Sequence, residues 1–476
     1  MSSKVASFLK INIQLISAIP KIFCFLPATI YPAQSSFFVS EILSYKLNFH
    51  KSGMDIKNLK SNSVKLNNGL ELILYKDSTM PLVALHLLYK VGSANEVNGK
   101  SGLAHLFEHM MFQGSQNIPK GMQFKLVQEA GGIMNGATSF DRTVYYYKLP
   151  SNQIELALWM ESDRMGFLLP TLDEAKLKNQ IDVVSNERLE RYDNQPYGLA
   201  WEIIHSNLFP EDHPYHSVVI GSLNDISNST LTDILQFAQQ YYCPSNASLV
   251  VAGDYPENIV ELVEKYFGEI NSNGKNSLPK FIADWKVTGN KITRYEDVQL
   301  NRIYLAWKTD KIFSKFDARL DILGEILTGS KSSRLQKKLI YENELVQDIT
   351  ANQFSGKYDG YFYIIATLKP GIDAERVKEI VISELNSISK NGITETELQK
   401  CKNVTRSGFI YSIQNIDSLA AQFNSYNFYL GSPNNFEYEL NEIESIQPDE
   451  IKSAVDKYFF NPFVELQIVR NKKATQ

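Results

Sequence analysis

Cysteine is scarce in this sequence, with three residues at Cys24, Cys243 and Cys401. Their odd number and wide spacing indicate no disulfide framework, and they lack the paired spacing of a cysteine zinc site. A basic excess is also absent, because the formal net charge is -5. With no surplus of lysine and arginine to neutralise phosphates, we do not expect nucleic acid as the main partner.

Long, proline-free apolar runs are missing too, so we expect no stable membrane-spanning helix. The N-terminal region nevertheless differs from the rest, because Lys4, Lys10 and Lys21 precede the apolar stretch "IFCFLPATIYPAQSS". A basic start, a short apolar core and a small-residue exit are typical of a secretory signal. We therefore expect residues 1–60 to be a signal-like or disordered extension. The expected location is exported or periplasmic, and the alternative is cytoplasmic.

The length of 476 residues exceeds one ordinary core and favours two to three domains. An internal duplication divides the chain. At an offset of 217 residues, "LNDISNSTLTDILQFAQQYYCPSNASLVV" from Leu223 lies over "LNEIESIQPDEIKSAVDKYFFNPFVELQI" from Leu440 without a gap. Both segments have the order helix, aromatic pair, strand. We expect homologous domains over 61–270 and 281–476, with a polar linker over 271–280.

The pattern from Val64 onward predicts an α+β fold. "VKLNNGLELILYKD" is typical of a hairpin, "LVALHLLYKVG" of a buried strand, and "IMNGATSFDRTVYYYKLP" of two strands around a polar turn. The stretch "AHLFEHMMFQ" has helical apolar spacing, with Ser101 available as the cap. A long helix is expected over about 171–193, opened by a capping box at Thr171.

Two histidines four residues apart, His105 and His109, flank Glu108 inside this mostly apolar stretch. At the offset of 217, "HLFEH" lies over "ILGEI", so the second copy has isoleucine at both histidine positions. No histidine follows His216. Placing two imidazoles where a core helix takes isoleucine costs desolvation free energy unless something binds them. We therefore favour a metal site over two satisfied core histidines.

The spacing explains how one ion can be held. Residues i and i+4 lie one above the other on a helix, so His105 and His109 can bind the same ion. Glu108 lies beside them and can reach a metal-bound water without being a ligand. Zinc suits imidazole and carboxylate ligands, and it lowers the pKa of a bound water to roughly 7. H-x-x-E-H is the signature of the inverted zincins, and a third protein ligand must come from elsewhere.

"GLAHLFEHMMFQGS", followed by "VVSNERLERYDNQPYG", resembles the pitrilysin/insulinase family of inverted zinc peptidases, which includes mitochondrial processing peptidase. The resemblance covers about Val64 to the C-terminus. It implies two homologous domains, each a mostly antiparallel sheet packed with helices, and one zinc ion per chain. The family takes its third ligand from a glutamate in a long downstream helix. The carboxylates of that helix here include Glu174, Asp182, Glu187 and Glu190. Residue types alone do not choose among them, and the resemblance selects Glu187.

The resemblance also extends to neighbouring positions. Several relatives have a second glutamate seven residues before the ligand, where this chain has Gln180, which can still hydrogen-bond to a histidine. The family binds substrate as an added strand at a sheet edge. "GGIMNGATSFDRTVYYY" is similar to that edge, with Asn135, Gly136, Ala137 and Thr138 matching. An ordinary hairpin is the alternative for this segment.

The C-terminal half departs from the family pattern. Relatives carry an arginine and, seven residues later, a tyrosine that contact bound substrate. In "SSRLQKKLIYENELVQDI" these positions fall on Ile340 and Gln347. Arg334 and Tyr341 have the same spacing but a shifted register, which we interpret as coincidence. We therefore expect a heterodimer, in which an inactive homologous subunit supplies the Arg–Tyr pair.

The resemblance implies a zinc-dependent endopeptidase that hydrolyses unfolded peptides or short polypeptides. Glu108 would assist the attack of zinc-bound water as the general base. One alternative is a non-proteolytic scaffold subunit of the family, against which the retained histidines and Glu187 argue. A zinc hydrolase of a non-peptide substrate is the other, since only the edge strand speaks for a peptide.

Overall fold

The computed structural model describes residues 56, 59–272, 274, 279, 281 and 285–471. The expected signal-like extension over 1–60 lies almost wholly outside these residues, as does much of the expected linker over 271–280. Export and the domain boundaries therefore stay predictions. Within the described ranges, no helix combines the length and the apolar character needed to cross a membrane.

The first half forms a six-stranded sheet in the order β1-β2-β6-β3-β5-β4, antiparallel except between β2 and β6. Its strands are β1 (Asn62–Lys65), β2 (Glu71–Lys76), β3 (Leu82–Tyr89), β4 (Ile133–Thr138), β5 (Thr143–Pro150) and β6 (Ala247–Gly253). Its helices are α3 (Leu103–Met110), α4 (Met122–Glu129), α5 (Ile154–Phe167), α6 (Glu174–Arg188), α7 (Ala200–Leu208), α8 (Leu223–Ser227), α9 (Leu231–Tyr241) and α10 (Ile259–Phe267). The expected hairpin, strands and metal-motif helix are all confirmed.

The second half repeats this arrangement in a five-stranded sheet, β7-β11-β8-β10-β9. Its strands are β7 (Lys291–Glu296), β8 (Arg302–Thr309), β9 (Val346–Ser355), β10 (Gly360–Leu368) and β11 (Val464–Arg470). Its helices are α11 (Asp317–Thr328), α12 (Ala374–Asn391), α13 (Glu395–Ser412), α14 (Ile416–Leu430), α15 (Phe436–Ser445) and α16 (Pro448–Tyr458). Helix α16 is the equivalent of α9 at the offset of 217, and strand β11 is the equivalent of β6. The expected two homologous α+β domains are confirmed.

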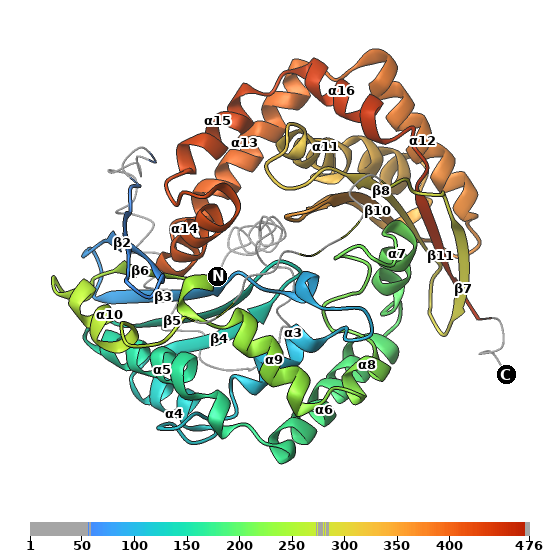
Figure 1. Ribbon diagram of the computed structural model, residues 1–476. Helices are drawn as coiled ribbons and strands as arrows, with labels where there is room; N and C mark the ends of the chain where they lie inside the picture. Colours follow the sequence, from blue (N-terminus) through green and yellow to red (C-terminus); the bar gives the residue numbers. More distant parts are fainter. Residues whose placement is uncertain are drawn as a thin grey trace, which may run out of the picture.

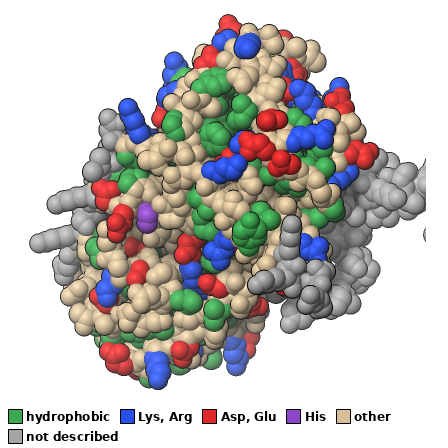
Figure 2. Space-filling view, turned by 90° about the vertical axis from the view of Figure 1, so that its right-hand side faces the viewer, with side chains coloured by type: hydrophobic (Ala, Val, Ile, Leu, Met, Phe, Trp, Pro, Cys, Tyr) green, Lys and Arg blue, Asp and Glu red, His purple; other side chains and the backbone are tan. Residues whose placement is uncertain are grey.

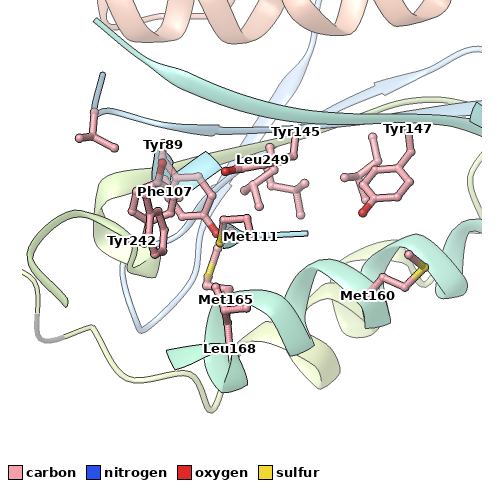
Figure 3. Packing of buried hydrophobic residues seen from close by; sticks show 14 of the residues in the cluster. Tyr89, Phe107, Met111, Tyr145, Tyr147, Met160, Met165, Leu168, Tyr242 and Leu249 are labelled. Carbon is pink, nitrogen blue, oxygen red and sulfur yellow. The ribbon is translucent and has the colours of Figure 1, made fainter. Parts of the chain in front are cut away.

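An aromatic core lies between the first sheet and its own helices (Figure 3). The Phe107 ring of α3 lies 4.4 Å from the Tyr242 ring, which lies 4.4 Å from Tyr89 of β3. All three side chains are buried. Because large rings fill this layer at close packing, α3 has little freedom to shift against the sheet.

The opposite face of each sheet is covered by a helix from the other half. Helix α14 packs on β3 and β6, and α7 packs on β8 and β11 (Figure 1). Phe423 and Ala420 of α14 share a buried cluster with Val250 of β6. Ile204 of α7 is buried with Leu466 of β11. The two helices overlap at the offset of 217, so the exchange is reciprocal and each half completes the core of the other.

A buried amide fixes the position of α14 on the first sheet. Asn424 donates to the carbonyl oxygens of His86 and Ser248, at 2.9 and 3.1 Å, and its Nδ2 lies 3.0 Å from the Nδ1 of His86. The Ser248 hydroxyl donates to its Oδ1. Burial lowers the pKa of His86 to about 3, so the imidazole stays neutral. A satisfied polar group in an apolar interface favours one register over its neighbours.

The tip of the β4–β5 hairpin is also tied to the second half. Asp141 accepts hydrogen bonds from the hydroxyls of Tyr215, at 2.6 Å, and Tyr429, at 3.2 Å. Its other contact is the backbone N–H of Lys357 in the β9–β10 turn, at 2.8 Å. Burial raises the pKa of Asp141, and the three donors partly offset that effect. The turn that follows the C-terminal end of β4 is thus held by groups from both halves.

Helix α6 begins later than predicted. Its N-cap is Asp173, whose carboxylate accepts the N–H of Lys176 at 2.7 Å. The predicted cap, Thr171, is wrong because it belongs to a preceding 3-10 turn, within which its hydroxyl is bonded. The helix continues as a π-helical turn, η5 (Leu189–Asp193), so the helical stretch does reach the expected end.

Charged side chains of both signs are mixed on the face of the molecule that is turned to the right in Figure 1. Figure 2 shows basic and acidic side chains close together on this face, with apolar side chains among them. This distribution agrees with the small net charge of -5 for the whole chain.

The helix exchange predicts that the two halves unfold together. Phe423→Ala removes a fully buried ring and should lower the free energy of unfolding by about 3–5 kcal/mol. Hydrogen exchange should show the same loss of protection in β3 and in β10, because both sheets depend on exchanged helices.

Tyr411→Ala serves as the control, since Tyr411 is 69% exposed and should change stability by about 0.5 kcal/mol or less. Loss of protection confined to one half in Phe423→Ala would contradict this interpretation of the interface.

Candidate metal centre

Helix α3 is fixed at its N-terminus by Glu96, whose carboxylate accepts the N–H groups of Gly102, at 3.0 Å, and Ala104, at 2.8 Å. Gly102 has φ 88°, a left-handed conformation that favours glycine. The predicted cap, Ser101, is wrong because its hydroxyl donates to Asp225 instead, at 2.5 Å. Burial raises the pKa of Glu96 to about 8. A buried acid thus sets the start of the helix that carries the histidines.

The structure brings His105, His109 and Glu187 together. The Nε2 atoms of His109 and His105 lie 3.4 and 4.0 Å from the same oxygen, Oε2, of Glu187. One ligand atom from each residue lies within 4.8 Å of the others, and no other group of three or more such residues in the described chain does so. Packing of α6 against α3 creates this arrangement. Glu174, Asp182 and Glu190, the other carboxylates of the region, are not part of it.

His105 does not behave as a satisfied core histidine. Its Nδ1 is buried and has no hydrogen-bond partner among the described residues, and its Nε2 is beyond hydrogen-bond distance of Glu187. His205 provides the contrast, because its Nδ1 lies 2.7 Å from the Tyr215 carbonyl oxygen and its Nε2 lies 3.1 Å from the Tyr361 hydroxyl. The Nε2 of His105, the nitrogen that faces Glu187, therefore makes no hydrogen bond within the described residues and is available as a metal ligand.

The charge states of His105 and Glu187 suit a metal. At His109, burial is outweighed by the hydrogen bond to Glu187 and the nearby Glu108, which raise its pKa, so an ion would displace a proton there. Burial, reinforced by the nearby charge of His109, lowers the pKa of His105 to about 4, so its imidazole is neutral near pH 7. Burial alone would raise the pKa of Glu187, but its hydrogen bond to His109 and the neighbouring positive charges lower it. A neutral imidazole and an ionised carboxylate are the forms that bind metals.

The donor set fits zinc. Bonds of about 2.0–2.1 Å in tetrahedral geometry place neighbouring ligand atoms about 3.3–3.4 Å apart. The His109–Glu187 separation of 3.4 Å already has this value, and the His105–Glu187 separation of 4.0 Å needs only a small rotation. Two imidazoles and one carboxylate leave a fourth position open, as in catalytic zinc sites.

Two further side chains, Gln180 and Arg191, contact His109 and Glu187 respectively. Gln180, a buried residue of α6, lies close enough to His109 to raise its pKa, and its amide donates to Asn179 at 2.9 Å. Arg191 of η5 donates to Oε1 of Glu187 at 2.5 Å, which leaves Oε2 to face the histidines. Arg191 was not predicted from the sequence. Its spacing of i+4 from Glu187 is a known pattern for helical ion pairs and is the feature that points to it.

Glu108 lies next to the group without joining it. The residue is 9% exposed, and burial raises the pKa of its carboxyl group. The Thr138 hydroxyl donates to its Oε2 at 2.6 Å. Gly136 also lies close, because a Cβ there would be 3.1 Å from Oε1 of Glu108. The buried acid therefore faces both the histidines and strand β4.

Strand β4 is the edge strand of its sheet, as the predicted substrate edge requires. Its four matched residues, Asn135, Gly136, Ala137 and Thr138, all lie within it and pair only with β5 on one side. Gly136 N–H donates to the side-chain oxygen of Asn135 at 2.9 Å. The structure therefore places the matched residues beside Glu108 at a sheet edge.

The residues of the second half that differ from the family pattern take part in packing or ion pairs, or lie exposed on the surface. Ile340 packs against the second core and Gln347 is exposed on β9. Arg334 is bound in ion pairs with Glu384, at 3.1 Å, and Glu397, at 2.8 Å, so its guanidinium is not free for substrate. Tyr341, at the spacing of seven, is 51% exposed.

Two family models match the chain. The model described as "Insulinase (Peptidase family M16)" matches residues 72–219, and the "Peptidase M16 inactive domain" model matches residues 228–405. The chain is similar to "Zinc protease PqqE" of Helicobacter pylori, with 32% identity over 77% of this chain and 83% of that protein. It is also similar to "Uncharacterized zinc protease YmxG" of Bacillus subtilis, with 24% identity over 82% of this chain and 94% of that one.

Solved structures show the same fold. The crystal structure of a protease from Helicobacter pylori has a TM-score of 0.80 and 30% identity, and it covers 86% of this chain and 99% of its own. The periplasmic protease PqqL from Escherichia coli has a TM-score of 0.69 and 18% identity over 87% of this chain and 48% of its own, a likeness in fold alone. This chain belongs to the insulinase family of peptidases, peptidase family M16.

Proposed function

We propose that this chain is a zinc-dependent endopeptidase that hydrolyses unfolded peptides or short polypeptides, with one zinc ion held by His105, His109 and Glu187. The observation that carries the proposal is the convergence of these three groups beside the buried Glu108. Membership of the insulinase family supports it. The relatives from Helicobacter pylori and Bacillus subtilis are both named zinc proteases, which supports the metal.

Each residue has a separate task in the proposed reaction. A bound zinc ion would supply Lewis acidity for the peptide carbonyl and lower the pKa of water at the site. His105, His109 and Glu187 hold that ion, and Arg191 keeps one oxygen of Glu187 turned away from it. Glu108 takes the proton of the attacking water and returns it to the leaving amine. Burial raises the pKa of Glu108, which strengthens it as a base for this exchange.

The edge of β4 is the proposed peptide site, and the second half supports this choice by contrast. There, the equivalent edge strand β9 is already capped, because the Ala351 N–H donates to the Thr328 hydroxyl at 2.8 Å. Gln336 also donates to the Ile349 carbonyl oxygen, at 3.3 Å. In the described first half, no side chain hydrogen-bonds to the backbone of Met134, the equivalent of Ala351, and the β4 amide of Gly136 is bound by the strand's own Asn135. An extended peptide can therefore add to β4 by main-chain hydrogen bonds.

A partner subunit completes the proposed enzyme. The substrate-contacting arginine and tyrosine of the family are replaced by Ile340 and Gln347, and Arg334 is held by Glu384 and Glu397. A homologous subunit with a degenerate zinc motif would supply the missing pair. The proposed assembly is a heterodimer in which this chain contributes the metal.

Removal of a ligand should remove the metal. His105→Ala and Glu187→Gln should each lower the zinc content from about one ion per chain to near zero, measured by elemental analysis after dialysis. Gln116→Ala is a suitable control because its exposed side chain lies outside the group. Full zinc occupancy in both ligand variants would show that these residues do not bind the ion.

Glu108→Gln should retain both zinc and fold while peptidase activity falls about 100- to 10,000-fold. The amide keeps the size of the side chain but cannot accept a proton. In the unmodified protein, kcat/KM should decline as pH falls through the raised pKa of Glu108, because the protonated acid is no longer a base. Activity of Glu108→Gln within a few-fold of the unmodified protein would exclude this role.

The chain alone should cleave a fluorogenic unfolded peptide weakly, and a homologous subunit carrying the Arg–Tyr pair should raise the rate on mixing. Both chains should then co-migrate in gel filtration, and a chelator should abolish the activity. Full-rate cleavage by the isolated chain would argue against the heterodimer but not against the zinc site. A stable complex without chelator-sensitive cleavage would favour the scaffold alternative.

A further inference from the structure

The side chain of Thr138 hydrogen-bonds to Glu108, the proposed general base. The pairing of β4 with β5 does not depend on this contact. The Thr138 hydroxyl donates to Oε2 of Glu108 at 2.6 Å, and the backbone N–H of Thr138 also lies near enough to lower the pKa of this carboxyl group. Thr138 is the last residue of β4, beside the turn held by Asp141. Because the hydroxyl projects from a strand end that the turn holds in place, its bond restricts the orientation of the carboxylate.

The neighbouring backbone leaves room for this arrangement. The other oxygen of Glu108, Oε1, lies over Gly136, where a Cβ would come within 3.1 Å of it. A residue with a side chain at 136 would push the carboxylate away from the strand. The Glu108 carboxylate thus lies against β4 because the Thr138 hydroxyl donates to one of its oxygens and Gly136 has no side chain that would displace the other.

The second half indicates that this contact belongs to the metal site and not to the fold. Glu325 occupies the position of Glu108 at the offset of 217, on α11 beside the edge strand β9. Ile322 and Ile326 replace the histidines there. In the described second half, no hydroxyl donates to the Glu325 carboxylate, since Ser333 bonds its backbone oxygen instead, although burial also raises the pKa of Glu325. The same fold therefore forms without the threonine contact.

We propose that Thr138 is a positioning residue for the hydrolytic reaction, whose hydroxyl holds the Glu108 carboxylate in the orientation that receives the proton of the attacking water. This inference rests on the proposed function. It assigns the side chain of Thr138 a task separate from main-chain binding of the peptide at β4. A flexible glutamate samples several rotamers, and only one directs an oxygen lone pair at the water position.

The test compares two substitutions that preserve the strand. Thr138→Val keeps the β-branched shape and the backbone N–H but removes the hydroxyl, and Thr138→Ser restores a hydroxyl. Thr138→Val should lower kcat about 10- to 100-fold with KM and zinc content unchanged, because the strand edge and the ligands are intact. Thr138→Ser should recover most of that loss. Thr171→Val, a loss of a hydroxyl far from Glu108, is the control and should leave both constants unchanged.

Crystal structures of the same variants provide a readout that does not depend on activity. In Thr138→Val the Glu108 carboxylate should rotate away from the strand, and in Thr138→Ser it should return to its place. A carboxylate that stays in place in Thr138→Val overturns the proposal whatever the rates are. A raised KM with unchanged kcat also overturns it, because Thr138 would then act in peptide binding. An unmodified protein without zinc-dependent cleavage would instead reject the proposed function, and the crystal structures would still decide the role of Thr138.

Discussion

Two half-buried imidazoles on one face of a helix impose the constraint on which the first half depends. His105 is neutral, and its Nε2 lies just beyond hydrogen-bond distance of Glu187. Leaving this nitrogen without a partner costs free energy, and an ion held between the three groups would satisfy it. The surrounding structure keeps it in place: Glu96 binds the start of α3, and Phe107 packs that helix into the aromatic core. The preorganised geometry that a catalytic metal site needs is therefore held by the fold before any ion binds.

The second half contributes to this preorganisation although it has no metal ligands of its own. It covers the first sheet with α14 and holds the β4–β5 turn through Lys357 and Tyr429. Tyr197, in the loop after α6, reaches the second half as well, because its hydroxyl donates to the Leu300 carbonyl oxygen at 2.7 Å. Both elements that flank the proposed site, β4 and α6, are thus anchored on the duplicated domain. Duplication supplied a scaffold whose own edge strand, β9, is closed by side chains.

Much of the fold and of the site was predictable because it depends on local periodicity. The i, i+4 spacing of His105 and His109 follows from helix geometry, and the duplication was visible as an ungapped offset. Glu187 could not be chosen by spacing, because several carboxylates of the same helix are chemically equivalent and only packing against α3 distinguishes them. The resemblance supplied that choice.

The errors and omissions involve contacts between distant segments. Ser101 and Thr171 both have side chains that can cap a helix, but Glu96 and Asp173 take those roles because the loops place them nearer to the amides. An amphipathic pattern shows that one face of a helix is buried, but it does not show which half covers it, so the exchange of α7 and α14 was not predicted. The bond from Thr138 to Glu108 depends on how closely β4 approaches α3, which no sequence pattern encodes.

The most direct test of the central claim is a crystal structure of the zinc-loaded protein with diffraction measured on both sides of the zinc absorption edge. The account predicts one anomalous peak, within about 2.0–2.2 Å of the two imidazole nitrogens and the carboxylate oxygen of Glu187. Glu108 should remain outside bonding distance of the ion. A peak bound by other residues, or a protein that takes up no zinc while correctly folded, would contradict the account.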